Sequence, residues 1–502
     1  MRISLKALKE PALLFGRGEF DVDPKIGLQK GGLLSLDDGS TKAIRIGLVS
    51  VDSETSKIFH WLKRLGGWMI DSADNALRFP KFPGSQKAVH CKFEINEIKH
   101  VKEIAEGEFQ AALKAGSQSE RFEKLLDLYS SRIKALFRDG GPSCVVVGFP
   151  EEVATLRIAN NRLSFQEQRL LQRLQEESNA EQMELFDNFT EEERRAAREL
   201  LPQAEDLLFR NFHRALKARC MNLHGAVPLQ VIRSHTYEPD SSKQNDATKA
   251  WNITVALAYK SGEIPWQPAH LAAGVCFVGI SFHHLKRRSG DLVYASLAQA
   301  YSTDTEPYAI KGESIPRSQR IGKQPYLKPE QAKQIIKRVI EQYHDQTGTV
   351  PARIVVHKSS QFMDPEVIGF RECLKEDVSH VDLVSLSPTG LRLLNKGTKE
   401  IGRGSFVQVE NCRTFLFTSG YVDWWKSYPG PHIPAPLELR RACDEDLEHC
   451  AAEILALTKM NWNSAEGLGR TPITISFARQ VGTVMTELGE EDEVNPFFRF
   501  YM

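Results

Sequence analysis

The chain has 502 residues, of which 41% are hydrophobic and 26% charged, and its 65 Lys and Arg residues balance 65 Asp and Glu residues. This composition is typical of a soluble globular protein and excludes a disordered or fibrous chain. The length allows two large domains or about three of ordinary size. Zero net charge argues against nucleic-acid binding driven by a cationic tail, so a nucleic-acid site has to be a local basic patch.

The cysteines and the apolar runs indicate where the protein is found. The eight cysteines are scattered and lack the C-x-x-C spacing of a zinc site, so we expect reduced thiols in the cytoplasm. The apolar stretch at the amino terminus is too short and too interrupted for a signal peptide, and no run of about 18 apolar residues occurs. We therefore expect a cytoplasmic protein with no membrane segment.

Residues 1–150 alternate short apolar runs with amphipathic stretches. The runs at 43–51 and 143–150 are rich in β-branched residues and predict buried strands, whereas apolar residues recur at helical spacing over 121–137. A helix followed by a buried strand is typical of a parallel α/β layer.

Residues 160–222 are dense in Glu, Gln and Arg and predict two or three solvated helices inserted into the first domain. Thr190, followed three residues later by Glu193, fits a capping box and favours a helix start there. The charged run at 190–200 is interpreted as a solvated helix face, with a binding stripe as the alternative.

From about residue 227 onward, strand-like apolar runs return and predict a mixed sheet flanked by helices. A helix is expected over 328–348, because Pro329 lies in its first turn and Gly348 follows its end. Further helices are expected near 440–458 and 475–487. The strand-like runs lie at 228–234, 253–259, 274–282, 353–359, 381–387 and 413–420.

Common catalytic motifs are missing from the sequence. No phosphate-binding G-x-x-x-x-G-K-[ST] loop, dinucleotide-binding G-x-G-x-x-G, zinc-binding H-E-x-x-H or G-x-S-x-G nucleophile motif occurs. The usual nucleotide-binding, zinc-protease and serine-hydrolase classes are therefore disfavoured.

Several segments carry a family resemblance. The sequences FHRALKARCMNLHGAVPLQVIR, LTKMNWN and TPITISFA, together with PALLFG and DPKIGL near the start, resemble short prokaryotic Argonautes built from MID and PIWI domains alone. They begin at residues 212, 457, 471, 11 and 23, and the resemblance extends over nearly the whole chain.

The resemblance implies an α/β fold of two domains. A MID-like domain with a Rossmann-like parallel sheet is expected over 1–230, with the helical insertion around 160–222. An RNase H-like PIWI domain with a mixed sheet is expected over 231–502, and residues 212–233 are expected to join the two.

The resemblance also implies that the PIWI domain does not cut. Active members hold two divalent cations with carboxylate or imidazole ligands on neighbouring strands, and Ser281, Ser359 and Arg479 occupy three of those positions. A hydroxyl is a poor metal ligand and a guanidinium repels a cation, so these positions are degenerate. The remaining ligand, a glutamate, is not aligned, and Glu306 and Glu313 are both nearby.

A pocket for the guide 5′-phosphate is implied by the same resemblance. His213 and Lys217 are four residues apart and so share one helix face, while Thr155 and Arg157 stand where the family commonly has a tyrosine-lysine pair. A terminal phosphate carries about two negative charges near neutral pH, and cationic side chains held in place form charge-assisted hydrogen bonds to it. An ordinary solvated surface is the alternative for these residues.

The aromatic ending at 497–501 should bury well and thereby place the terminal carboxylate of Met502. In the family, that carboxylate helps to hold a divalent cation shared with guide phosphates, and oxygen ligands suit Mg²⁺. A buried terminal strand is the alternative.

The function implied is a sensor in prokaryotic immunity. The chain is expected to bind guide RNA with a 5′-phosphate, to recognise complementary single-stranded target DNA, and to activate a separate APAZ-containing effector. That effector is a TIR or sirtuin-like NADase or a nuclease acting in defence against plasmids or phage, and assembly into a higher oligomer on activation is left open. The alternatives are a guided endonuclease with an unconventional centre, and a PIWI-fold interaction protein that has lost nucleic-acid binding.

Overall fold

The computed structural model of the chain describes residues 3–36, 41–70, 75–137, 141–159, 209–238, 245–286, 292–316, 318–321, 324–372, 378–394, 401–409, 413–429, 433–442, 446–488 and 495–502. Most of the insertion expected at 160–222, including the capping box at Thr190, lies outside these residues. Among the helices of the described residues, none combines the length and the apolar character that a membrane span needs.

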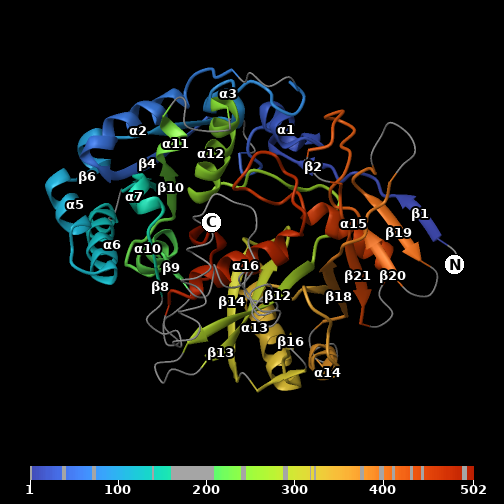
Figure 1. Cartoon of the computed structure of the whole chain (residues 1–502). Helices are drawn as coiled ribbons and strands as arrows, with labels where there is room; N and C mark the ends of the chain where they lie inside the picture. Colours follow the sequence, from blue (N-terminus) through green and yellow to red (C-terminus); the bar gives the residue numbers. More distant parts are fainter. Residues whose placement is uncertain are drawn as a thin grey trace, which may run out of the picture.

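A parallel five-stranded sheet lies in the left part of Figure 1. Its order is β10-β7-β4-β5, and β6 pairs with β4 beyond the end of β5. Every residue of β7 is buried, as expected for a strand covered on both faces. The strands are β4 (Lys42–Val51), β5 (Cys91–Glu94), β6 (Val101–Ile104), β7 (Cys144–Phe149) and β10 (Leu229–Arg233).

Helices cover both faces of this sheet. The apolar side chains of α2 and α12 contribute to the core on one face, and those of α6 and α10 to the core on the other. The bounds of the helices in this half are α2 (Asp52–Arg64), α3 (Ser85–Val89), α4 (Glu97–His100), α5 (Glu106–Leu113), α6 (Gln118–Lys134), α7 (Glu151–Ala154), α10 (Phe212–Cys220), α11 (Ser234–Tyr237) and α12 (Asp246–Lys260).

The strand expected at 253–259 is wrong, because these residues belong to α12. This helix is buried on nearly all sides, with Trp251, Val255 and Leu257 among its fully buried side chains. A helix that is apolar all round loses the 3.6-residue alternation of a surface helix, so its sequence reads like that of a buried strand.

A mixed nine-stranded sheet forms the lower and right part of Figure 1, in the order β1-β19-β20-β21-β18-β17-β12-β13-β14. Strands β12, β17 and β18 run parallel, and the other neighbours pair antiparallel. The strands are β1 (Ile3–Ala7), β12 (Val275–Lys286), β13 (Leu292–Tyr301), β14 (Tyr308–Pro316), β17 (Arg353–Lys358), β18 (His380–Pro388), β19 (Ser405–Val409), β20 (Arg413–Leu416) and β21 (Leu437–Arg441).

Alternate residues of β12 face different layers of helices. Cys276, Val278 and Ile280 join the core of α13 (Pro329–Thr347) and α14 (Asp364–Glu372). Val275 and Phe277 join the core that includes α12 and α16 (Ile473–Met485). Helix α15 (Leu447–Leu457) precedes α16, and residues 458–472 between them form no strand.

The segments that carried the family resemblance pack against one another. The Lys459 ammonium donates to the carbonyl oxygens of Pro11 (2.9 Å) and Val22 (2.6 Å), and Trp266 Nε1 donates to the Lys459 carbonyl at 3.0 Å. Three short strands join the start of the chain to the residues before β12: β2 (Leu13–Leu14), β3 (Phe20–Asp21) and β11 (Gln267–Pro268). Helix α1 (Pro24–Gly31) follows β3 and is N-capped by Asp23.

The α/β fold class, with one parallel and one mixed sheet, is confirmed. The two sheets do not divide the chain at a single point, because β1 lies in the nine-stranded sheet whereas β10 spans residue 230 in the parallel sheet. The domain boundary between 230 and 231 therefore stays a prediction.

Candidate nucleic-acid interface

Helix α10 carries the two pocket residues that the sequence predicted. Asn211 is its N-cap, and the Asn211 side chain accepts a hydrogen bond from the Arg214 amide at 3.3 Å. The first helical residue, Phe212, packs edge to face with the rings of Phe122 and Phe149 at 5.5 and 5.4 Å. The N-terminus of α10 is therefore held by a cap and by an aromatic cluster.

Lys217 is buried, with 4% of its surface exposed. Its ammonium donates to the main-chain oxygens of Tyr501, at 3.3 Å, and Met502. The spacing predicted for His213 and Lys217 places them about one turn apart on the described helix.

Lys260 is a second buried ammonium in the same cluster, and the sequence analysis did not identify it. It is the last residue of α12, is 2% exposed, and donates to Oε1 of Gln230 at 2.6 Å. Among the described residues, neither Lys217 nor Lys260 forms an ion pair with a carboxylate side chain.

The electrostatics of the cluster favour an anion. Burial lowers the pKa of Lys217 well below its usual range, and the neighbouring Lys260 lowers it further. Burial likewise lowers the pKa of Lys260 to about 8. Burial and then Lys217 and Lys260 hold the pKa of His213 well below its usual value, and its Nε2 atom is buried without a hydrogen-bond partner. Buried cations are costly unless anions or dipoles compensate their charge. Lys217 contacts the main-chain oxygens of Tyr501 and Met502 and Lys260 contacts a neutral amide, and a bound anion would compensate the charge that remains.

Thr155 and Arg157 lie near the start of α10, where the Phe212 amide donates to the Leu156 carbonyl oxygen at 3.4 Å. The Thr155 side chain is exposed, and its hydroxyl donates to the Glu151 carbonyl at 2.8 Å. Arg157 is also exposed and belongs to β8 (Arg157–Ala159), where it pairs with Asn211 of β9 (Phe209–Asn211). The structure therefore brings the 155–157 loop to the N-cap of the pocket helix.

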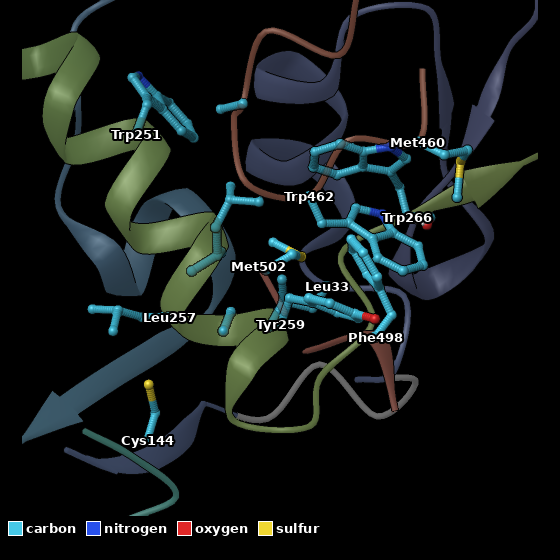
Figure 2. Close-up of a cluster of buried hydrophobic side chains, with 14 of the residues drawn as sticks. Leu33, Cys144, Trp251, Leu257, Tyr259, Trp266, Met460, Trp462, Phe498 and Met502 are labelled. Carbon is cyan, nitrogen blue, oxygen red and sulfur yellow. Dashed lines mark hydrogen bonds between the residues drawn. The ribbon is translucent and has the colours of Figure 1, made fainter. Parts of the chain in front are cut away.

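The end of the chain lies at the centre of the molecule, where α10, α12 and α16 approach it (Figure 1). Residues 498–500 form a 3₁₀ turn, η3 (Phe498–Phe500), and not the terminal strand that was the alternative. Figure 2 shows the rings of Tyr259, Trp462 and Phe498 gathered around Met502, which is 3% exposed. The burial expected from the aromatic ending thus places the Met502 main-chain oxygen beside Lys217.

The three positions predicted to have lost metal ligands lie on β12 (Ser281), directly after β17 (Ser359) and on α16 (Arg479). Ile280 of β12 pairs with Lys358 of β17, so Ser281 and Ser359 follow at the same level on neighbouring parallel strands. Ser281 is an even number of residues from Val275 and Phe277 on the same strand, so its side chain lies on their face of the sheet, which α16 covers. Arg479 is exposed on α16, whose first turn packs so closely on Gly279 that a Cβ there would lie 2.2 Å from the Thr474 carbonyl oxygen.

An ion pair closes the end of β17 beside these positions. Lys358 and Glu366 are almost fully buried, and the Lys358 ammonium lies 2.7 Å from both Glu366 carboxylate oxygens. The same carboxylate accepts from the amides of Leu327 and Met363 at 3.1 and 2.8 Å. Both carboxylate oxygens of Glu366 therefore accept two hydrogen bonds each.

The two glutamates left open by the sequence analysis differ in their surroundings. Glu306 accepts from Arg499 at 2.7 Å, and burial raises the pKa of its carboxyl. Glu313 is exposed on β14. Within the part of the chain that the structure describes, no group of three or more His, Cys, Asp or Glu side chains is arranged to hold a metal ion.

The chain has the fold of the MID and PIWI region of Argonaute proteins, with the buried cations lying where the parallel half meets the mixed half. It is similar over 99% of its length to Clostridium butyricum Argonaute bound to a guide DNA (5′ deoxycytidine) and a 19-mer target DNA, with a TM-score of 0.63 and 14% identity.

Two further solved structures are similar over 99% of the chain, each with a TM-score of 0.57. These are Aa-Ago with externally bound siRNA, at 16% identity, and Drosophila Piwi, at 11%. The chain spans only 55 to 56% of the length of these three proteins. No protein-family model and no curated protein sequence matches it.

Proposed function

We propose that this chain binds a guide strand through its 5′-phosphate and recognises a complementary target. The observation that carries the proposal is the pair of buried lysines Lys217 and Lys260 with the half-buried His213 beside them, within an Argonaute MID-PIWI fold. Among the described residues, neither lysine has a carboxylate side-chain partner. A terminal phosphate carries about two negative charges near neutral pH and accepts several hydrogen bonds. It matches the cluster in charge and in hydrogen-bonding capacity.

The guide is proposed to be RNA and the target single-stranded DNA, by resemblance to short prokaryotic Argonautes. The Clostridium butyricum protein was solved with a guide and a target, which supports a two-strand mode of binding for this fold. Sequence would then be read by base pairing, while the protein contacts backbone and duplex shape.

We further propose that Mg²⁺ helps to hold the 5′-phosphate. The donor set includes the Met502 main-chain oxygen beside Lys217, and a hard cation prefers such oxygen ligands. Bound there, Mg²⁺ would neutralise phosphate charge. Lys217 itself would orient the phosphate by donating from a fixed, buried ammonium.

The chain is proposed not to cut its target. Ser281 and Ser359 offer hydroxyls, and Arg479 offers a positive charge, at positions where the family uses metal ligands. Activity is instead assigned to a separate APAZ-containing effector, a TIR or sirtuin-like NADase or a nuclease, in cytoplasmic defence of a prokaryote against plasmids or phage. Guide-target pairing would shift the assembly toward its active form, with or without a higher oligomer.

The test begins with the purified chain. Nucleic acid that co-purifies with it is end-labelled, and binding is measured for matched guides with a 5′-phosphate or a 5′-hydroxyl. Short 5′-phosphorylated RNA and a clear preference for the phosphate support the proposal. Equal affinity for both guides refutes it and favours the interaction-protein alternative, whereas guide-directed cleavage with Mg²⁺ or Mn²⁺ favours the endonuclease alternative.

A further inference from the structure

Glu487, two residues beyond the end of α16, contacts the start of the pocket helix α10. Its side chain is 2% exposed. Its Oε1 accepts a hydrogen bond from the Asn211 amide at 3.1 Å, and its Oε2 accepts from Arg210 Nε at 2.9 Å. Asn211 is the N-cap of α10, so one buried carboxylate of the PIWI half fixes the residue at which the His213 and Lys217 helix begins.

Arg210 extends this connection to a third element. Its guanidinium lies 4.7 Å from the centroid of the Phe122 ring and also pairs with Glu123, both on α6. A carboxylate this deeply buried is costly unless its bonds are well made, and here the arginine and the main-chain amide supply them. The contact is therefore geometrically demanding, which suits a positioning role.

Gln480 provides a second contact from α16 to the pocket. Its Nε2 donates at 3.4 Å to the Tyr501 carbonyl oxygen, which also accepts from Lys217 at 3.3 Å. Helix α16 and the residues directly after it thus touch the N-cap side of α10 through Glu487 and the Lys217 side through Gln480.

We infer that Glu487 and Gln480 are positioning residues by which α16 holds the 5′-phosphate pocket in its binding geometry. This inference rests on the proposed function of the pocket. Neither side chain has to touch the guide, because Glu487 acts through the N-cap of α10 and Gln480 through the oxygen that orients the Lys217 ammonium. Their effect is therefore confined to the phosphate.

The test compares 5′-phosphorylated and 5′-hydroxyl guides of one sequence. Glu487→Gln keeps an oxygen for the Asn211 amide but removes the charge that Arg210 faces. The preference for the phosphate should fall about fivefold, or about 1 kcal/mol, while affinity for the 5′-hydroxyl guide stays constant. In a Lys217→Ala background, Glu487→Gln should lower the preference no further, because both changes act on the same contact.

The control is Glu453→Gln. Glu453 is a buried carboxylate of α15 that accepts from Arg353 at 2.6 and 3.1 Å, and neither residue belongs to the pocket. It should lower thermal stability as Glu487→Gln does but leave the phosphate preference unchanged. If Glu487→Gln does not fold, Gln480→Met carries the same test.

The outcomes separate this inference from the proposed function. A wild-type phosphate preference that persists in both α16 variants overturns the positioning role and leaves the pocket in place. If Glu487→Gln lowers the phosphate preference further in the Lys217→Ala background, the positioning role is also overturned, because the effect then does not act through Lys217. A wild-type protein without any phosphate preference overturns the pocket and the positioning role together.

Discussion

Replacing Lys260 by methionine should make the unliganded protein more stable while weakening its hold on the guide. Lys260 is buried at the end of α12, and its ammonium donates to a neutral amide oxygen of Gln230. Methionine has a similar length and carries no charge. The substitution therefore removes a buried charge from the free protein and a phosphate partner from the complex.

The size of the stability gain follows from the pKa of Lys260. Burial lowers it from 10.5 to about 8, and each unit of pKa is worth about 1.4 kcal/mol, so the buried ammonium costs about 3 kcal/mol near pH 7. Leaving the Gln230 oxygen without its donor takes back about 1 to 2 kcal/mol. A net gain of about 1 to 2 kcal/mol is expected.

The pKa of Lys260 also predicts how the free energy of unfolding changes with pH. Because the folded protein releases this proton near pH 8 and the unfolded chain near 10.5, the unfolded state binds more protons between these values. The contribution of Lys260 to the free energy of unfolding therefore rises with pH across this window. The Lys260→Met variant should lack that rise.

Denaturant unfolding at pH 7 and pH 9.5 measures the gain in stability, and titration with the guide measures the loss of affinity. Losing one charge-assisted hydrogen bond, about 1.5 to 3 kcal/mol, should weaken binding of the 5′-phosphorylated guide roughly tenfold or more. The matched control is Lys358→Met. It leaves the buried Glu366 carboxylate without its partner and should destabilise the protein by about 3 to 5 kcal/mol.

Two results would refute the reasoning. A Lys260→Met protein that unfolds more easily than wild type at pH 7 would show that the ammonium is compensated in the folded state. A variant that is more stable but binds both guides as wild type does would remove Lys260 from the pocket.

Further predictions address the other parts of the site. Lys217→Ala should weaken binding of a 5′-phosphorylated guide roughly tenfold or more and barely change binding of a 5′-hydroxyl guide, and equal losses in a titration would remove Lys217 from the pocket. Affinity for the phosphorylated guide should fall between pH 7 and 9, because Lys260 loses its proton near its pKa of about 8; an unchanged affinity over this range would contradict that assignment. Residues appended after Met502 should weaken guide loading and reduce its Mg²⁺ dependence, which loading assays with and without the metal would show. Arg479→Ala should restore no cleavage, since it adds no ligand, and guide with matched target should still stimulate the effector subunit; effector activity independent of complementarity would end the sensor proposal.

The local sequence was sufficient to predict a strand that is buried on both faces and a helix that has one apolar face. The β-branched run at Cys144–Phe149 predicts a strand because a parallel strand is apolar on both faces, and the helical spacing over 121–137 predicts most of α6. The spacing of His213 and Lys217 likewise predicts a shared helix face. These features depend on neighbours within a few residues.

The tertiary structure decided which residues form the cluster of His213, Lys217 and Lys260 that we propose binds phosphate. Lys260 was missed because the run before it reads as a strand, and only as the last residue of α12 does it reach Gln230 and the surroundings of Lys217. The phosphate-binding role of Thr155 stays a prediction. No local pattern reports which distant groups a side chain will meet.

The sequence by itself determined the α/β class, the two kinds of sheet and the resemblance to Argonautes, because hydrophobic periodicity and short motifs are local properties of the chain. Only the tertiary structure decided that Lys217 and Lys260 are buried close enough to interact, that Glu487 just after α16 contacts the N-cap of α10, and that Met502 ends beside Lys217. The physical reason is that the cost of burying a charge depends on the solvent removed and the partners supplied, and both come from residues far away in the chain.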